Sequence, residues 1–188
     1  MAGFAGMGKS TLARAIGRAT GAVVVDLDVL KSAALDGGVD WQRSSQIAYE
    51  GLYATTEDLV RQGFSVIMDC PCRFERIVEA GMAIAARHGA DYGYVECHLA
   101  DQYELRRRLR SRTPLRSQGP DLGVPPSDAP PDAYAPFIDA DGDLRVPPSC
   151  YPTTPWIRVD TGRPTDECLA DVLSYLTRLR SPGRVASP

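Results

Sequence analysis

Apolar positions along the chain follow two spacings, one typical of buried strands and the other of amphipathic helices. Short runs of apolar, β-branched residues predict strands, whereas longer segments with apolar residues three and four positions apart predict helices. The predicted strands cover residues 22–25, 64–68, 92–99 and 155–159. The predicted helices cover residues 9–20, 29–35, 41–62, 74–88, 102–112 and 165–180. In the longest of these helices Ile47, Leu52, Leu59 and Val60 are among the apolar positions.

Strands and helices alternate along the sequence, which is the pattern of βαβ units. Such units build an α/β fold with a parallel sheet and helices on both faces. Acidic residues directly follow three of the predicted strands, namely Asp26, Asp69 and Asp160. The carboxyl ends of parallel strands meet at one edge of the sheet, where ligands bind. Each acid could also cap the next helix, so no single one of them establishes a site.

The composition changes between residues 113 and 154, which hold most of the chain's prolines. Neither a regular helix nor a central strand is expected here, because proline lacks the backbone N–H that both need. A long segment without regular structure is often a lid or an insert. We therefore predict a single domain over residues 1–188, with a basic helix and a proline-rich lid or insert at about 101–154.

The overall composition narrows the class of protein. The 188 residues suffice for one domain with a sizeable core. A formal net charge of −3 gives no general attraction to nucleic acid or to an anionic membrane. No apolar run approaches the roughly 18 residues that span a bilayer, and the sequence has no signal-peptide pattern. The five cysteines are scattered and odd in number, which favours reduced thiols and a cytoplasmic location.

A glycine-rich loop stands at the start of the chain. Residues Gly3–Ser10 read G-F-A-G-M-G-K-S, which fits the phosphate-binding pattern G-x-x-x-x-G-K-[ST]. Polyphosphate needs inward-pointing backbone N–H groups, glycines that leave room, and a helix N-terminus behind them. Lys9 would reach the β- and γ-phosphates, and the hydroxyl of Ser10 would hold Mg²⁺. The predicted nucleotide-binding residues here are Gly3, Ala5, Gly6, Met7, Gly8, Lys9, Ser10 and Thr11. The alternative is a glycine-rich cap on an ordinary helix.

The strand that normally precedes such a loop is short in this sequence. A buried strand takes about five residues, whereas only Met1 and Ala2 come before the loop. Without this strand the sheet would have a gap, with unpaired N–H and C=O groups on its neighbours. We therefore expect a truncated first strand and a sequence that starts late.

The loop alone is compatible with a GTPase, an ATPase or a kinase. The N-K-x-D motif of guanine recognition does not occur, and a motor-type ATPase would normally be longer. A small-molecule kinase needs a carboxylate for the acceptor hydroxyl, cations for the transition state and a lid against water. In an extended Asp26-Leu-Asp28 segment both carboxylates would point to one side, Asp26 to the metal and Asp28 to the substrate. Arg108 and Arg112 would share one face of the basic helix.

Six motifs together resemble the P-loop small-molecule kinases of AAA type. These motifs are G-F-A-G-M-G-K-S-T-L-A-R, V-V-V-D-L-D-V-L, V-I-M-D, Y-V-E-C-H-L, L-R-R-R-L-R-S-R and I-R-V-D-T-G. The family includes chloramphenicol phosphotransferase-like, gluconate kinase-like and zeta-toxin-like groups, and the resemblance covers Gly3–Arg112 and Trp156–Leu179. It implies a P-loop NTPase fold of the nucleoside-kinase-like kind, with ATP and Mg²⁺ as cofactors. It also implies that Asp28 is the base, that Arg108 and Arg112 contact phosphates, and that adenine lies near Thr161, Gly162 and Arg163.

The sequence therefore predicts a kinase that transfers the γ-phosphoryl group of ATP to a hydroxyl of a small molecule. A sugar acid, a nucleoside or an antibiotic could be the acceptor, and Asp69 and Arg73 could bind it. One alternative is a regulatory nucleotide-binding protein or an ATPase without phosphotransfer. A polynucleotide 5′-kinase is less favoured, because no aromatic residues interleave the basic segment 106–116. A redox role for Cys70-Pro-Cys72 is a further alternative.

Overall fold

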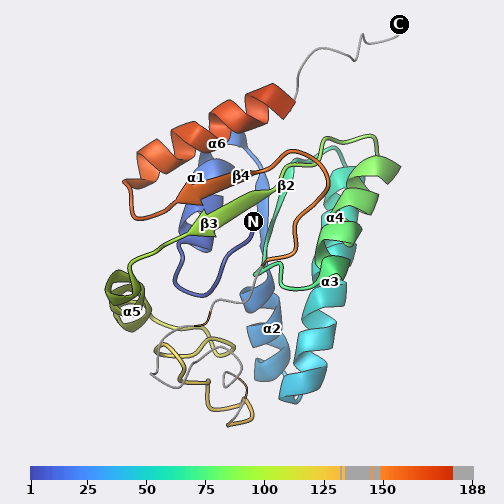
Figure 1. The fold of residues 1–188 in the computed structure, drawn as a ribbon. Helices are drawn as coiled ribbons and strands as arrows, with labels where there is room; N and C mark the ends of the chain where they lie inside the picture. Colours follow the sequence, from blue (N-terminus) through green and yellow to red (C-terminus); the bar gives the residue numbers. More distant parts are fainter. Residues whose placement is uncertain (132, 134–144, 146–148, 180–188) are drawn as a thin grey trace, which may run out of the picture.

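The computed structural model describes residues 1–131, 133, 145 and 149–179, and its ribbon is drawn in Figure 1. The helices are α1 (Lys9–Thr20), α2 (Leu27–Asp36), α3 (Trp41–Arg61), α4 (Glu75–Arg87), α5 (Gln102–Ser111) and α6 (Thr165–Leu179). The strands are β1 (Val23–Asp26), β2 (Val66–Asp69), β3 (Val95–His98) and β4 (Ile157–Asp160). Every predicted element is present, and most of the boundaries lie within two residues of the predicted ones.

The strands form two parallel pairs, β1 with β2 and β3 with β4. Met1 and Ala2 lie between these pairs, where the sequence predicted a gap (Figure 1). The N–H of Ala2 donates to the carbonyl of Val95 at 2.7 Å, and the N–H of Cys97 donates to the carbonyl of Ala2 at 2.8 Å. The amino group of Met1 donates to the carbonyl of Met68 at 2.8 Å. A single bridge thus stands in the place of a full first strand.

Helices cover both faces of the sheet, as predicted. Helices α1 and α6 pack on one face, and α3 and α4 pack on the other (Figure 1). Two hydrophobic clusters fill the space between helices and strands. The first contains Phe4, Met7, Leu12, Ile16, Val95, Leu105, Leu109, Val159, Val172 and Tyr175. The second contains Ala2, Val25, Leu27, Ala48, Leu52, Ile77, Val78 and Tyr94. The architecture is therefore the predicted α/β P-loop arrangement.

Ile47 is an apolar residue of α3 that lies outside the core. It is 45% exposed. The buried residues of α3 are Ser44, Ala48, Leu52 and Thr56, which recur every four positions. Consecutive helical residues are rotated by roughly 100°, so Ile47 points well away from this stripe. Three of the four buried residues are small or polar, so apolar periodicity alone does not indicate the buried face of α3.

The segment after α5 lacks helices and regular strands in the part that the structure describes. Residues 113–131 form turns and an isolated antiparallel bridge between Asp121 and Val124. Residues 132, 134–144 and 146–148 of the predicted lid lie outside the described residues. Across the described chain, helices that are both long and apolar enough to traverse a bilayer are absent.

Candidate phosphate-transfer site

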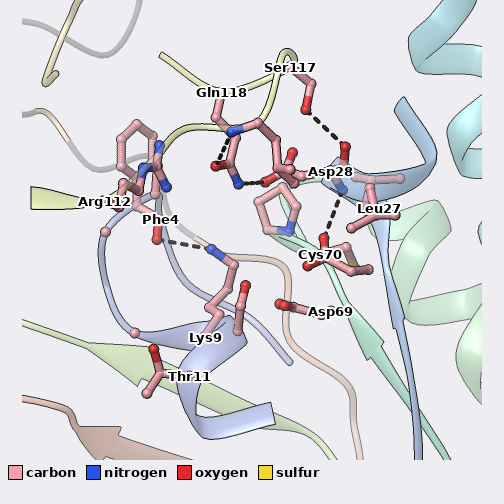
Figure 2. A pocket seen from close by; sticks show the side chains of 18 of the residues that line it. Phe4, Lys9, Thr11, Leu27, Asp28, Asp69, Cys70, Arg112, Ser117 and Gln118 are labelled. Atoms are coloured by element: carbon pink, nitrogen blue, oxygen red, sulfur yellow. Dashed lines mark hydrogen bonds between the residues drawn. The ribbon is translucent and has the colours of Figure 1, made fainter. Parts of the chain in front are cut away.

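The glycine-rich loop connects Ala2 to the N-terminus of α1. Gly3 has a φ of +124°, and a Cβ there would lie 2.4 Å from the carbonyl oxygen of Cys97, so a side chain does not fit. Gly8 caps α1 in the left-handed conformation with a φ of +78°. The ammonium of Lys9 donates to the carbonyl of Phe4 at 3.0 Å, which places it at the mouth of the loop (Figure 2). This curl before a helix N-terminus is the geometry that binds polyphosphate.

The loop opens into a pocket of about 1080 Å³, which has room for a nucleotide and a second small molecule. The predicted site residues that line it are Ala5, Gly6, Gly8, Lys9, Ser10, Thr11, Asp26, Asp28, Asp69, Arg73, Arg108, Arg112 and Arg163. Gly3, Met7 and Gly162 are not among the lining residues. Met7 is 3% exposed within the core, and the N–H of Gly162 donates to the carboxylate of Asp160 at 2.9 Å.

Asp26 and Asp28 are not the extended pair that the sequence predicted. Helix α2 begins at Leu27, so Asp26 ends β1 while Asp28 lies in the first helical turn. Asp26 caps this helix, because its Oδ1 accepts from the N–H of Asp28 at 2.9 Å. Its Oδ2 also lies 3.4 Å from the guanidinium of Arg14. Burial, together with the carboxylates of Asp69 and Asp28, raises the pKa of Asp26. Both Asp26 and Asp28 still line the pocket.

Asp69 is the most unusual acid of the site. It ends β2, is 3% exposed, and lies beside Lys9 in Figure 2. Neither of its carboxylate oxygens has a hydrogen-bond partner among the described residues. It is not a helix cap, because Phe74 holds that position before α4. A buried carboxylate without partners is costly, and a bound cation with its water shell would satisfy it.

A Mg²⁺ ion fits this corner of the pocket. Ser10, Asp26 and Asp69 line it from α1, β1 and β2, and they would supply oxygen ligands or water-shell acceptors. The described residues contain no cluster of three or more His, Cys, Asp or Glu side chains suited to a metal ion. Mg²⁺ does not require one, because it usually keeps several waters and takes one or two carboxylates plus phosphate oxygens. The donor set therefore agrees with Mg²⁺ held jointly by protein and nucleotide.

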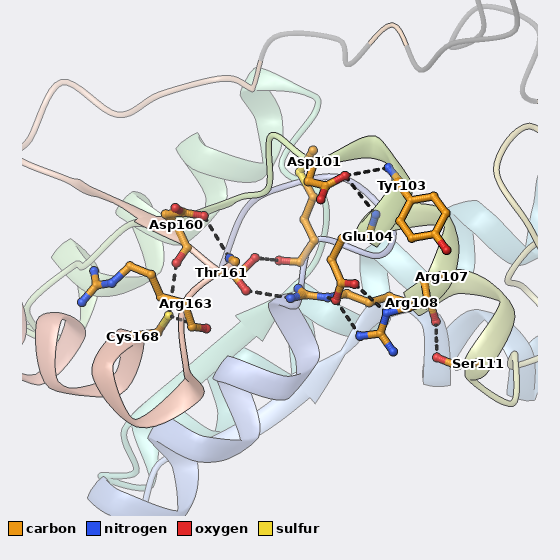
Figure 3. Close-up of polar contacts among 12 residues, drawn as sticks. Asp101, Tyr103, Glu104, Arg107, Arg108, Ser111, Asp160, Thr161, Arg163 and Cys168 are labelled. Atoms are coloured by element: carbon orange, nitrogen blue, oxygen red, sulfur yellow. Dashed lines mark hydrogen bonds and ion pairs between the residues drawn. The ribbon is translucent and has the colours of Figure 1, made fainter.

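Arg108 of α5 and Arg112, which follows α5, both line the pocket. Arg108 donates to Glu104 at 2.7 Å and to the carbonyl of Thr161 at 2.9 Å (Figure 3). The Thr161 hydroxyl in turn donates to the carbonyl of Met7 at 3.0 Å, which links α5 to the loop. The predicted shared helix face for Arg108 and Arg112 was wrong, because α5 ends at Ser111 and Arg112 has an extended backbone. Both residues nevertheless line the same pocket.

A contact between the proline-rich segment and α2 was missed at the sequence level. The side-chain amide of Gln118 donates to Oδ2 of Asp28 at 2.7 Å (Figure 2). The hydroxyl of Ser117 donates to the carbonyl of Asp28 at 3.1 Å, and the N–H of Ser117 donates to the buried hydroxyl of Ser32 at 3.0 Å. Gln118 and Asp28 are 90 positions apart, and polar residues in an irregular segment carry no periodic signal that could pair them.

The remaining predicted residues have ordinary structural partners. Arg163 lines the pocket, and its guanidinium pairs with Glu167 at 3.0 Å and with Asp171 at 2.7 Å. The thiols of Cys70 and Cys72 are buried and lie 3.6 Å apart. All five cysteines are free thiols, in agreement with the odd and scattered set in the sequence.

The sequence profile of a family described as an AAA domain matches residues 1–121. The chain belongs to this AAA domain family. A search of curated protein sequences found no match. The membership agrees with the glycine-rich loop and the strand-end acids, all of which lie inside the matched residues.

Solved structures with the same fold include three kinases. A candidate kinase from Chloroflexus aurantiacus shares 20% identity over 94% of this chain and 93% of that chain, with a TM-score of 0.66. An APS kinase from Mycobacterium tuberculosis shares 20% identity over 94% of each chain, with a TM-score of 0.59. A gluconokinase from Sinorhizobium meliloti shares 19% identity over 95% of this chain and 90% of that chain, with a TM-score of 0.53. At this identity the likeness shows the P-loop kinase-like fold alone.

Proposed function

We propose that the protein is a kinase that transfers the γ-phosphoryl group of ATP to a hydroxyl of a small molecule, with Mg²⁺ as cofactor. The observation that carries this proposal is that Lys9, Asp69, Asp28 and Arg108 line the same pocket. A regulatory nucleotide-binding protein would need the loop but not an acid beyond it. The similar APS kinase was solved in complex with AMPPNP and APS, which is consistent with two ligands in such a pocket.

The loop would bind the polyphosphate of the nucleotide. Backbone N–H groups at the N-terminus of α1 attract anionic oxygens, and Lys9 at the mouth of the loop would move from the Phe4 carbonyl to the β- and γ-phosphates. Ser10, Asp26 and Asp69 would hold Mg²⁺, which supplies positive charge at the transferring group when bound. Burial of Asp69 without partners supports this assignment.

Asp28 would orient the acceptor hydroxyl and take its proton. Its Oδ2 is held by Gln118 at 2.7 Å, which fixes the plane of the carboxylate and therefore the direction of its other oxygen. A fixed carboxylate at hydrogen-bond distance from the acceptor is the geometry that general-base catalysis requires. Gln118 is accordingly a positioning residue, and its contact joins the lid segment to the reacting group.

Arg108 and Arg112 would neutralise charge that develops on the transferring phosphoryl group. Both line the pocket, and Arg108 is held by Glu104 and by the carbonyl of Thr161. The segment that carries Ser117 and Gln118 would exclude water, which would otherwise compete with the acceptor. Gly162 and Arg163, which follow β4, would lie near the adenine, as the resemblance implies.

The basic segment does not favour a polynucleotide substrate. Arg107, Arg110 and Arg116 each pair with a carboxylate, at distances of 2.6, 2.7 and 2.9 Å. A surface that binds a phosphate backbone would keep such cations available to the nucleic acid. The ion pairs instead support a structural role for these three arginines.

Acceptor-dependent release of ADP tests the proposal. The full chain would be incubated with Mg²⁺-ATP and pools of hydroxylated sugars, sugar acids, nucleosides and antibiotics, with Asp28→Asn and Lys9→Met alongside. We expect one pool to stimulate ADP release. Asp28→Asn should keep its ATP affinity and lose turnover by about 100-fold or more, whereas Lys9→Met should lose both. ATP binding without stimulation by any pool, and unchanged in Asp28→Asn, would favour a regulatory nucleotide-binding protein.

A further inference from the structure

The pocket extends beyond Asp28 to a wall of apolar side chains from α2, α3 and the segment before α4. Val29, Trp41, Tyr49 and Phe74 line this part. Val29 is 48% exposed and Phe74 is 57% exposed, although both belong to a concave surface. The rings of Tyr49 and Phe74 meet edge to face, with centroids 6.2 Å apart. Exposed apolar surface inside a cavity marks a ligand-binding surface rather than a core.

Two cationic residues, Lys31 and Arg73, line the same part of the chain's pocket as these apolar side chains. The ammonium of Lys31 lies 3.1 Å from the centroid of the Trp41 ring, and Arg73 lines the same pocket. Lys31 forms no salt bridge among the described residues, although the carboxylate of Asp28 is near enough to stabilise its charge. Burial and the neighbouring Arg73 guanidinium lower the pKa of Lys31 to about 8, so it is mostly charged at neutral pH. A half-buried pair of cations of this kind favours a negatively charged ligand.

We propose that the phosphoryl acceptor is a compound that combines a planar aromatic ring with an anionic group. The ring would lie against Phe74, Tyr49 and Trp41, and the anionic group would lie between Lys31 and Arg73. This inference rests on the proposed kinase function, because it takes Asp28 as the group that receives the hydroxyl.

The surface chemistry discriminates among acceptor classes. A neutral polyol would place polar groups against the apolar side chains of Val29 and Phe74, and the two cations would not attract it. A polycationic aminosugar would be repelled by Lys31 and Arg73. An aliphatic acid would be attracted to the cations but would not pack against the rings. An aromatic anion does both, and stacking on aromatic faces contributes to its affinity.

Matched glycosides provide the test. Methyl β-glucoside, methyl β-glucuronide, phenyl β-glucoside and phenyl β-glucuronide carry similar hydroxyls but differ in ring and in charge. Their binding to the full chain would be measured by calorimetry with Mg²⁺ and AMPPNP present, so that the nucleotide site is filled. We expect phenyl β-glucuronide to bind at least about 10-fold more tightly than either probe with one feature alone. No binding of phenyl β-glucuronide at millimolar concentration would overturn the proposal.

Variants separate the two parts of the subsite. Lys31→Met should weaken both glucuronides by about 5- to 10-fold and leave the glucosides unchanged, and Phe74→Ala should weaken only the phenyl compounds. Arg76→Met is the matched control, because Arg76 pairs with Glu50 at the surface at 2.6 Å and is absent from the pocket lining. If the Lys31→Met variant bound all four probes more weakly by the same factor, Lys31 would have a structural role and the proposal would be overturned.

The outcome for the acceptor is distinguishable from the outcome for the kinase. ADP release stimulated by a neutral aliphatic acceptor, and lost in Asp28→Asn, would retain the kinase and refute the aromatic anion. Tight binding of phenyl β-glucuronide with no stimulated ADP release from any pool would retain the subsite and refute phosphotransfer.

Discussion

Replacing Asp69 by Asn should stabilise the protein alone and weaken its response to Mg²⁺-ATP. The carboxylate is 3% exposed and has no hydrogen-bond partner among the described residues. A buried polar group without a partner costs about 1–3 kcal/mol, and a charged one costs more. Asparagine keeps the shape and removes the charge that faces Asp26. We therefore expect the free energy of unfolding to rise by about 1–2 kcal/mol, which is roughly 2–8 °C in Tm for a domain of this size.

Thermal and urea unfolding with and without Mg²⁺-ATP would measure both effects. A ligand that binds only the folded state stabilises it by about 2.7 kcal/mol at a concentration 100 times its Kd. Wild type should show such a gain, and Asp69→Asn should lose most of the part that depends on Mg²⁺. The two changes have opposite signs, which a general effect of the mutation on folding would not produce.

Asp160→Asn is the matched control for this experiment. Asp160 ends β4 at the same edge of the sheet, but it is exposed and its carboxylate accepts from the N–H of Gly162 at 2.9 Å. We expect a small loss of stability and an unchanged response to Mg²⁺-ATP. The reasoning about Asp69 would be refuted if Asp69→Asn were less stable than wild type, or if it kept the full Mg²⁺-dependent gain.

Three further predictions follow from contacts around the pocket. Gly6→Ala should abolish nucleotide binding measured by calorimetry, because φ is +81° and a Cβ would lie 2.7 Å from the side chain of Leu105. Gln118→Leu should lower kcat by about 10-fold or more with little change in the KM for ATP, since it removes a hydrogen bond to the Asp28 carboxylate. Affinity for phenyl β-glucuronide should fall between pH 7 and 9, because Lys31, whose pKa is about 8, loses its charge beside Arg73 and Asp28 as the pH rises.

Specific results would contradict each of these three predictions. Nucleotide affinity equal to wild type in Gly6→Ala would mean that α5 shifts to admit the methyl group. An unchanged kcat in Gln118→Leu would remove the lid segment from catalysis. If the affinity for the uncharged phenyl β-glucoside fell as steeply with pH, the group that titrates would not be the one that contacts the anion.

The sequence predicted those parts of the molecule that depend on local pattern. Helix and strand positions follow from periodicity, and the meeting of Asp26 and Asp69 at one edge follows from parallel strands. The extended Asp26–Asp28 pair was wrong because Asp26 itself caps α2 and turns the chain at once. The cap was a recognised alternative for a strand-end acid, but sequence alone does not decide between the two.

Contacts between distant segments could not be predicted in this way. Gln118 meets Asp28 because the proline-rich segment folds back on α2, and the buried pair Ser32 and Ser117 anchors that return. Lys31 over Trp41 likewise depends on the packing of α2 against α3. Neither contact leaves a spacing or a composition that a reader of the sequence could detect.

The bridge at Ala2 links the two strand pairs of the sheet. Strands β1 and β2 carry Asp26 and Asp69, while β4 carries the turn at Thr161 that holds Arg108. The two strand pairs are joined by the hydrogen bonds of Met1 and Ala2. The pocket is lined by residues from both pairs or from the turns that follow them. A ligand that contacts both strand pairs would stabilise their association. The amides of Ala2 and Cys97 should therefore exchange their hydrogens with solvent more slowly once the pocket is filled.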